Sequence, residues 1–134
     1  MKGSLKKGLT FAKSVVVDES RVIGFMGKEG AVYATPRMVS DVEYTCRDFL
    51  LQHLDEGEDS VGAHVSIDHL APTPMGLEVS VEIKVAEVDR RKVTFEFSVR
   101  DPVEEVGRGK HVRFVVDTAK TRERLAAKRA KAGL

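Results

Sequence analysis

Two ionisable side chains interrupt apolar patterns in this 134-residue sequence, and their types suit acid–base chemistry. His69 ends a stretch, residues 61 to 69, in which every second residue is apolar, so we expect it on the apolar side of a strand. Glu43 falls inside the apolar stripe of the only strong predicted helix. A buried carboxylate without a partner is costly or takes up a proton. The two residues therefore predict an acid–base pair between helix and strand, and a purely structural contact, or a helix turned so that Glu43 reaches solvent, is the alternative.

Thr35 marks the start of the same predicted helix. Threonine is a good N-cap, and Pro36 suits the first helical position because its missing N–H would be unpaired there. A helix start also favours a developing negative charge through its free N–H groups and dipole. Thr35 stands eight residues before Glu43, roughly 12 Å along the helix axis. A small acyl group fits between them, while an ordinary structural cap is the alternative interpretation.

Other chemically competent residues carry weaker signals. Cys46 follows Glu43 by one turn and has the chemistry of a nucleophile, but a lone helical cysteine is usually a small buried hydrophobe. His64 and His69 are five residues apart on a strand, so they point to opposite faces and predict no metal site. His111 shows no spacing signal. The segment "GRGK" is too short for a nucleotide-binding loop.

Alternating apolar residues and short turns predict the strands and the helix that must position these side chains. We expect a single domain over residues 1–134 with a core over about 8–117, followed by a basic, solvated helix or tail over 118–134. Because one helix cannot cover two sheets and tight turns join antiparallel neighbours, we predict an α+β hotdog fold, a curved antiparallel sheet wrapped around one long central helix. The expected elements are a strand at 9–17, an irregular segment at 18–34, the helix from Thr35 to about Gly57, and strands at 61–69, 77–85, 93–99 and 106–116.

The amino-acid composition limits the kinds of binding partner that the protein is expected to have. The net charge is +1, from 22 basic and 21 acidic residues, so the overall field favours neither nucleic acid nor an acidic membrane surface. No window is apolar enough to span a bilayer. A single cysteine fits a reducing compartment, and the expected location is the cytoplasm.

Three motifs together resemble the fluoroacetyl-CoA thioesterases and their small hotdog relatives. They are the helix start "AVYATPRMVSDVEYTC", the strand and turn "SVGAHVSIDHLAPTPMGL", and the late "GRGKHVRF". The likeness runs from about residue 31 to residue 117 without an obvious gap.

The resemblance implies an acyl-CoA thioesterase with a Thr/Glu/His site. Thr35, Glu43 and His69 match the catalytic residues of the family. Gly62 matches a glycine close to the thioester and water, and Arg113 matches an arginine near the site. The resemblance also implies a homodimer with active sites at the interface, no metal, and no cofactor beyond the CoA of the substrate.

One difference between this sequence and the family limits which family properties we expect of this protein. The segment 18–34 is shorter than the aromatic-rich lid of the fluoroacetyl enzyme and holds only Phe25 and Tyr33 as aromatics. We therefore expect a short-chain acyl-CoA as substrate without selection for fluoroacetyl-CoA. A non-catalytic domain that binds or senses acyl-CoA is the main alternative. An enoyl-CoA hydratase is less favoured, because the Asp–His pair five residues apart is not found after Thr35.

Overall fold

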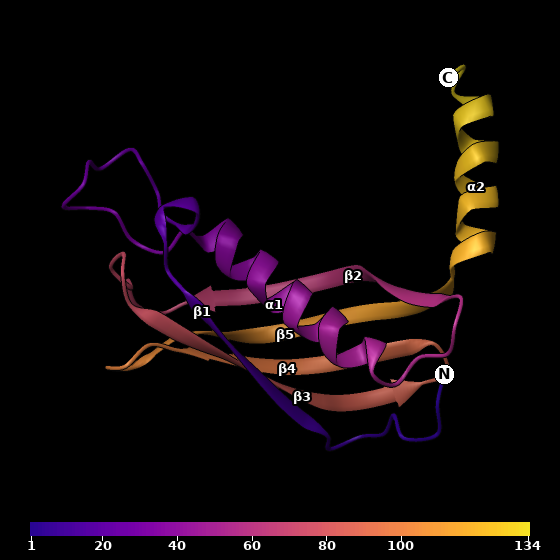
Figure 1. Ribbon diagram of the computed structural model, residues 1–134, viewed down its shortest axis with the longest axis horizontal. Coiled ribbons are helices and arrows are strands. Elements are labelled where there is room, and N and C mark those ends of the chain that lie inside the picture. The colour runs from indigo at the N-terminus through magenta and orange to yellow at the C-terminus, as the bar shows by residue number, and fades with distance from the viewer.

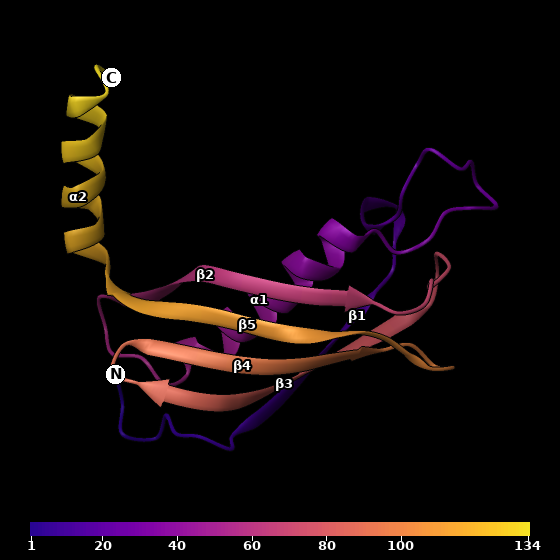
Figure 2. The same ribbon diagram turned by 180° about the vertical axis from the view of Figure 1, so that it is seen from behind.

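Five antiparallel strands form one curved sheet, and the long helix α1 lies across one face of it (Figure 1). The computed structural model describes residues 1–134, and the strand order is β1-β3-β4-β5-β2. This is the predicted α+β hotdog arrangement, and no helix covers the opposite face of the sheet (Figure 2). The elements are β1 (Thr10–Val16), a 3-10 helix (Glu19–Arg21), α1 (Thr35–Leu51), β2 (Glu58–His69), β3 (Glu78–Asp89), β4 (Lys92–Arg100), β5 (Glu105–Asp117) and α2 (Thr118–Lys131).

The core lies between α1 and the inner face of β3 and β4. Strand β3 alternates buried and more exposed residues, as the period of two predicts, and β4 does so except at Thr94, which is also buried. On the helix, Phe49 packs edge-on against Phe95 of β4, with ring centroids 6.1 Å apart, and also contacts Phe11 of β1. Met38, rather than the expected Val39, begins the fully buried stripe, and Val39 is half-buried. The helix is thus turned slightly from the predicted orientation.

Strand β2 does not keep one apolar face. A bulge between Gly62 and His64 shifts its register against β5, and an extra residue reverses the alternation of side chains. Before the bulge Ser60 is buried at 5% exposure, whereas Val61 is 45% exposed. Only the second half of the strand, ending at His69, follows the predicted pattern, so the expectation of one continuous apolar face over 61–69 is wrong.

Two glycines in β5 allow close packing. A Cβ on Gly107 would meet the side chain of Met38 on α1, and a Cβ on Gly109 would collide with the carbonyl oxygen of Ser66 on β2. Position 109 therefore requires glycine because the β2 backbone lies against it, whereas a larger residue at position 107 would have to displace the Met38 side chain.

The ends of α1 differ from the sequence expectation. Ala34 is the N-cap, without a side-chain cap, and Thr35 is already the first helical residue. Its hydroxyl is engaged elsewhere, as described below, so the N-cap prediction for Thr35 is wrong. The helix ends at Leu51, and Gly57 instead adopts a φ of +82° in the turn before β2, a conformation that glycine tolerates without strain.

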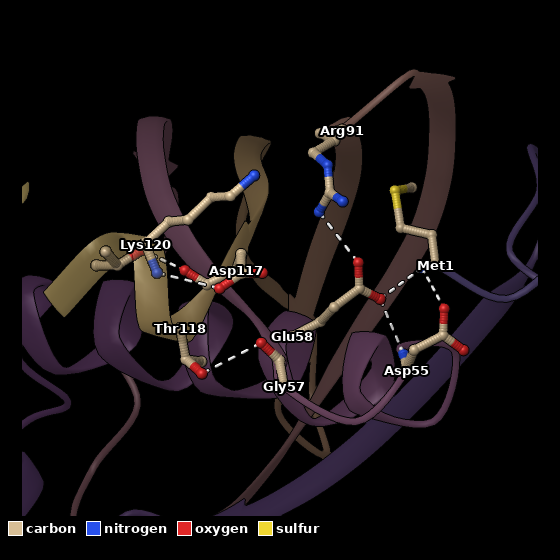
Figure 3. Close-up of polar contacts among 9 residues, drawn as sticks. Met1, Asp55, Gly57, Glu58, Arg91, Asp117, Thr118 and Lys120 are labelled. Atoms are coloured by element: carbon tan, nitrogen blue, oxygen red, sulfur yellow. Dashed lines mark hydrogen bonds and ion pairs between the residues drawn. The ribbon is translucent and has the colours of Figure 1, made fainter. Parts of the chain in front are cut away.

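Helix α2 leaves the end of β5 and projects away from the sheet (Figures 1 and 2). Figure 3 shows its base, where the Thr118 hydroxyl donates to the carbonyl of Gly57 at 3.1 Å and the Asp117 carboxylate accepts from the Lys120 N–H. Beside it, Arg91 pairs with Glu58 at 3.0 Å. None of the α2 residues is buried, in keeping with the predicted solvated helix. Neither α1 nor α2 is long and apolar enough to cross a membrane.

Candidate active site

Thr35 and His69 meet where α1 begins and β2 ends. Thr35 Oγ1 lies 2.7 Å from Nδ1 of His69, a hydrogen bond between residues far apart in the sequence. The other ring nitrogen, Nε2, is buried and has no hydrogen-bond partner within the chain. Burial lowers the pKa of His69, an effect partly opposed by the nearby backbone of Ala71. At neutral pH His69 is therefore a neutral imidazole, and one of its nitrogens has no hydrogen-bond partner in the chain.

Glu43 faces β2 about two turns further along α1. The carboxylate is half-buried and makes no hydrogen bond or ion pair within the chain. A Cβ on Gly62 would lie 2.6 Å from Glu43 Oε1, so the missing side chain of Gly62 leaves the space that this carboxylate occupies. The cavity here has a volume of about 390 Å³ and is lined by Glu43, Tyr44, Arg47, Ser60, Val61, Gly62 and Arg113.

Arg113 lies beside this cavity because it is the cross-strand partner of Gly62. The side chain is only 5% exposed. Its Nε donates to Ser60 Oγ at 2.8 Å, and its Nη2 donates to the Ser60 carbonyl at 2.8 Å. No carboxylate forms an ion pair with this guanidinium, and burial lowers its pKa. Arginine stays charged despite this burial, so Arg113 brings a positive charge to the cavity that the Glu43 carboxylate also lines.

His111 is a site residue that the sequence reasoning missed. It is fully buried, its Nδ1 lies 2.8 Å from the carbonyl oxygen of His64, and its Nε2 lies 3.3 Å from Arg113 Nη1. Burial, and to a lesser extent the nearby Arg113, lower its pKa. The available signal was its position two residues before Arg113, which places both side chains on the same face of β5.

The predicted residues thus form two groups. Thr35 and His69 form one group, and Glu43, Gly62 and Arg113 form the other, along the same side of α1. No hydrogen bond or ion pair joins Glu43 to His69, and both side chains are half-buried. The alternative of a structural Glu–His contact is therefore wrong, and the pairing of the two residues in acid–base catalysis stays a prediction.

Cys46 has the surroundings of a buried packing residue, with no exposed surface. Burial raises the pKa of its thiol to about 12, so the thiol stays protonated at neutral pH. No group of three His, Cys, Asp or Glu side chains converges closely enough to hold a metal ion.

A buried polar cluster holds segment 18–34 against α1. The Tyr33 hydroxyl donates to the carboxylate of Asp41, and Arg21 donates to both oxygens of that carboxylate from Nε at 3.0 Å and Nη2 at 3.1 Å. Burial raises the pKa of Tyr33, so the phenol stays protonated as the donor. The Tyr33 side chain is consequently held in the core. The other aromatic residue of the segment, Phe25, is 83% exposed.

Comparisons with known proteins agree with this fold. The chain matches the family model of the fluoroacetyl-CoA-specific thioesterase over residues 17–119. The fluoroacetyl-CoA thioesterase of Streptantibioticus cattleyicolor is 31% identical over 127 residues, which cover 90% of this chain and 91% of that protein. A crystal structure of a point variant of the fluoroacetyl-CoA-specific thioesterase FlK has a TM-score of 0.87 at 28% identity, covering 95% of this chain and 99% of that chain. The same variant in complex with fluoroacetate and CoA has a TM-score of 0.79 at 30% identity, covering 87% and 99% of the two chains.

Fold and similarity together define the class as a hotdog-fold thioesterase, a thioester hydrolase. The chain belongs to the fluoroacetyl-CoA-specific thioesterase family. The resemblance drawn from the three sequence motifs is thereby confirmed.

Proposed function

We propose that the protein hydrolyses a short-chain acyl-CoA to the free acid and CoA, with Thr35, Glu43 and His69 as catalytic residues and Gly62 and Arg113 beside the substrate. The observation that carries this proposal is the Glu43 carboxylate, which has no partner in the chain and faces the space left by Gly62 next to the buried Arg113. A carboxylate that is not used in packing is available for chemistry. Membership in the thioesterase family supports the same reaction.

The first turn of α1 supplies a donor for the thioester oxygen. Pro36 has no N–H, and the N–H groups of Arg37 and Met38 donate to the carbonyl of Ala34. The N–H of Thr35 makes no hydrogen bond within the chain, so it is the free donor at this helix start. We place the thioester carbonyl near this N–H, where a fixed donor stabilises the oxyanion as negative charge develops.

His69 transfers a proton in this scheme. Thr35 Oγ1 holds Nδ1, which leaves Nε2 as the nitrogen that meets the substrate. When the hydroxyl of Thr35 donates to Nδ1, the hydrogen of the neutral ring lies on Nε2 and is available to the oxyanion or to the departing CoA sulfur. Such proton transfer contributes roughly 10²–10⁴ in rate.

Glu43 takes part by one of two routes. Either its carboxylate attacks the thioester carbon, forming a mixed anhydride and releasing CoA thiolate before water cleaves the anhydride, or it removes a proton from an attacking water. Hydrolysis in H₂¹⁸O under single-turnover conditions distinguishes general-base catalysis from a covalent route that ends with water attacking the Glu43 carbonyl. The covalent route, in which water attacks the anhydride at the Glu43 carbonyl, leaves ¹⁸O in the peptide that contains Glu43, and the general-base route leaves it only in the acid product.

The substrate is a short acyl group without selection for fluorine. The segment 18–34 loops out beyond the start of α1 (Figure 1), and its two aromatic rings lie either in the core or in solvent. A single small substituent is worth only a few kcal/mol even in a fitted pocket. We expect the ratio of kcat/KM for fluoroacetyl-CoA over acetyl-CoA to stay below about 10³.

The test of the function is thiol release across acetyl-, propionyl-, butyryl- and longer acyl-CoAs, followed with a thiol reagent. Turnover with the short esters and a decline with chain length supports the proposal. Saturable binding of acyl-CoA by calorimetry without any thiol release contradicts it and assigns the chain to acyl-CoA binding or sensing.

A homodimer with the site at its interface is part of the proposal. β2 is an edge strand of the sheet, and the cavity beside Glu43 is lined on that strand by Val61, which is 45% exposed. Tyr44, on the same cavity, is 60% exposed. An open edge with exposed apolar side chains is typical of a surface that a second copy covers. Light scattering that shows only a monomer contradicts this part.

The free, buried Cys46 fits a reducing compartment, and we place the protein in the cytoplasm.

A further inference from the structure

We infer that His111 is a positioning residue, which links the bulge of β2 to Arg113 and so fixes the guanidinium next to Glu43. The inference rests on the proposed thioesterase function for its kinetic consequences. Its structural content is independent of that function, because it concerns how one buried imidazole orients one buried arginine.

The contacts of His111 permit only one protonation state. Nδ1 lies 2.8 Å from the carbonyl oxygen of His64, which only accepts, so Nδ1 must carry a hydrogen. Nε2 lies 3.3 Å from Nη1 of Arg113, which only donates, so Nε2 must present its lone pair. The neutral ring with hydrogen on Nδ1 satisfies both contacts, whereas an imidazolium would place an N–H against the guanidinium.

These contacts fix the plane of Arg113. Each of its three guanidinium nitrogens has a partner: Nε and Nη2 bond to Ser60, and Nη1 bonds to His111. Three of the five N–H bonds are thereby used, and two remain. Since Arg113 lines the cavity beside Glu43, the remaining N–H groups are available to a group bound there.

The three side chains converge on Gly62. A Cβ at this position would lie 2.6 Å from Glu43 Oε1, 3.4 Å from His111 Cε1 and 3.6 Å from Arg113 Nη1. The carbonyl that His111 binds belongs to His64, at the bulge that directly follows Gly62. His111 therefore couples the local shape of β2, which makes room for the carboxylate, to the direction of the arginine charge.

A neutral acceptor suits this role better than a charged one. A carboxylate at position 111 would pair with Arg113 and neutralise its charge within the protein. The imidazole orients the guanidinium without cancelling its charge, which remains free to stabilise the negative charge of the transition state. The Arg113 side chain, only 5% exposed, accordingly forms its hydrogen bonds with Ser60 and His111 rather than with a carboxylate.

Two matched variants separate the contacts of His111. His111→Asn keeps a side-chain N–H near the position of Nδ1, toward the His64 carbonyl, and lacks the acceptor for Arg113. His111→Gln places an amide oxygen near the position of Nε2, where it accepts from Arg113. We expect His111→Asn to lower kcat about 10- to 100-fold with KM changed by less than about threefold, and His111→Gln to recover most of that loss. Melting temperatures of both variants are measured alongside, and equal loss of activity in two folded variants overturns the inference.

A double-mutant cycle tests whether His111 acts through Arg113. In the Arg113→Lys background, His111→Asn is expected to lower kcat less than about threefold further, because the geometry it maintains has already been lost. Effects that multiply independently mean that His111 stabilises the fold without positioning Arg113, and they overturn the inference.

A spectroscopic measurement tests the geometry without turnover. Long-range ¹H–¹⁵N correlation spectra of the wild-type protein at neutral pH are expected to show His111 as the neutral tautomer with hydrogen on Nδ1. The Nε–H signal of Arg113 is expected to be resolved in the wild type and to broaden or shift in His111→Asn. An Nε2–H tautomer or an imidazolium overturns the inference. If the spectra match but the wild-type protein hydrolyses no thioester, the proposed function fails while the positioning of Arg113 stands.

Discussion

The hydroxyl of Thr35 lies 2.7 Å from Nδ1 of His69 and thereby joins the first residue of α1 to the last residue of β2. This bond orients the imidazole and leaves its buried Nε2 as the nitrogen without a partner. The same residue also carries the backbone N–H of the helix start that makes no hydrogen bond within the chain. The relationship makes the Thr35 side chain a means of directing His69, whereas the N-cap position belongs to Ala34.

Removing the Thr35 hydroxyl is expected to impair catalysis with little effect on the fold. Thr35→Val keeps the shape of the side chain but cannot donate to Nδ1, so His69 loses its fixed orientation. We expect kcat to fall at least about tenfold in thiol-release assays. Thr35 is exposed, so the free energy of unfolding should change by less than about 1 kcal/mol. Thr35→Ser, which keeps the hydroxyl, serves as the control, and a Val variant as active as the Ser variant argues against a role for the bond.

Glu43→Gln keeps the shape and hydrogen-bonding capacity of the side chain but removes the nucleophile or base. We expect turnover to fall at least about 10²-fold, a barrier increase of about 2.7 kcal/mol or more, with binding of acyl-CoA largely retained. Because Glu43 makes no hydrogen bond within the chain, stability should stay close to wild type. A variant that hydrolyses at the parent rate would leave Glu43 without a catalytic role.

Two glycine substitutions are expected to fail in different ways. In Gly62→Ala the new methyl group lies 2.6 Å from the end of the Glu43 side chain, which is free to swing away, so activity should drop while the melting temperature changes little. In Gly109→Ala the methyl group meets the backbone carbonyl of Ser66, which cannot move without breaking the pairing of β2 with β5. We expect this variant to lose stability by several kcal/mol or not to fold. Thiol release and urea unfolding on both variants check the contrast, which disappears if Gly62→Ala is as unstable as Gly109→Ala.

Stability is expected to fall as the pH decreases through the range in which histidines titrate. Burial lowers the folded-state pKa of both His69 and His111. The unfolded chain, with histidine pKa values of about 6.5, therefore takes up these protons first as the pH falls. The stabilisation is fully present above about pH 6.5 and is lost as the pH drops through the folded-state values. Melting temperatures at several pH values between about 7.5 and 5 should decline for the wild type and decline less for His69→Asn. Parallel curves for the two proteins would show that His69 does not contribute.

The sequence alone determined the fold class and the residue types of the site. Strands of period two joined by short turns, and one helix of period 3.6, leave few arrangements other than a curved antiparallel sheet over α1. These signals are local, since each depends on residues a few positions apart. Thr35, Glu43, His69, Gly62 and Arg113 were all indicated by position within such patterns or by the family motifs, and the family itself is confirmed.

Tertiary structure decided how those residues group. The bulge after Gly62 reverses the faces of β2, and no period-two pattern shows an inserted residue in advance, because the extra residue is defined only by pairing with β5. The same pairing brings Arg113 to Ser60 and His111 to the His64 carbonyl, contacts between segments about fifty residues apart. Likewise, Thr35 bonds to His69 rather than capping its own helix because the end of β2 lies beside that helix start. Composition and spacing specify what each segment can form, whereas hydrogen bonds between distant segments depend on the register in which the strands pair.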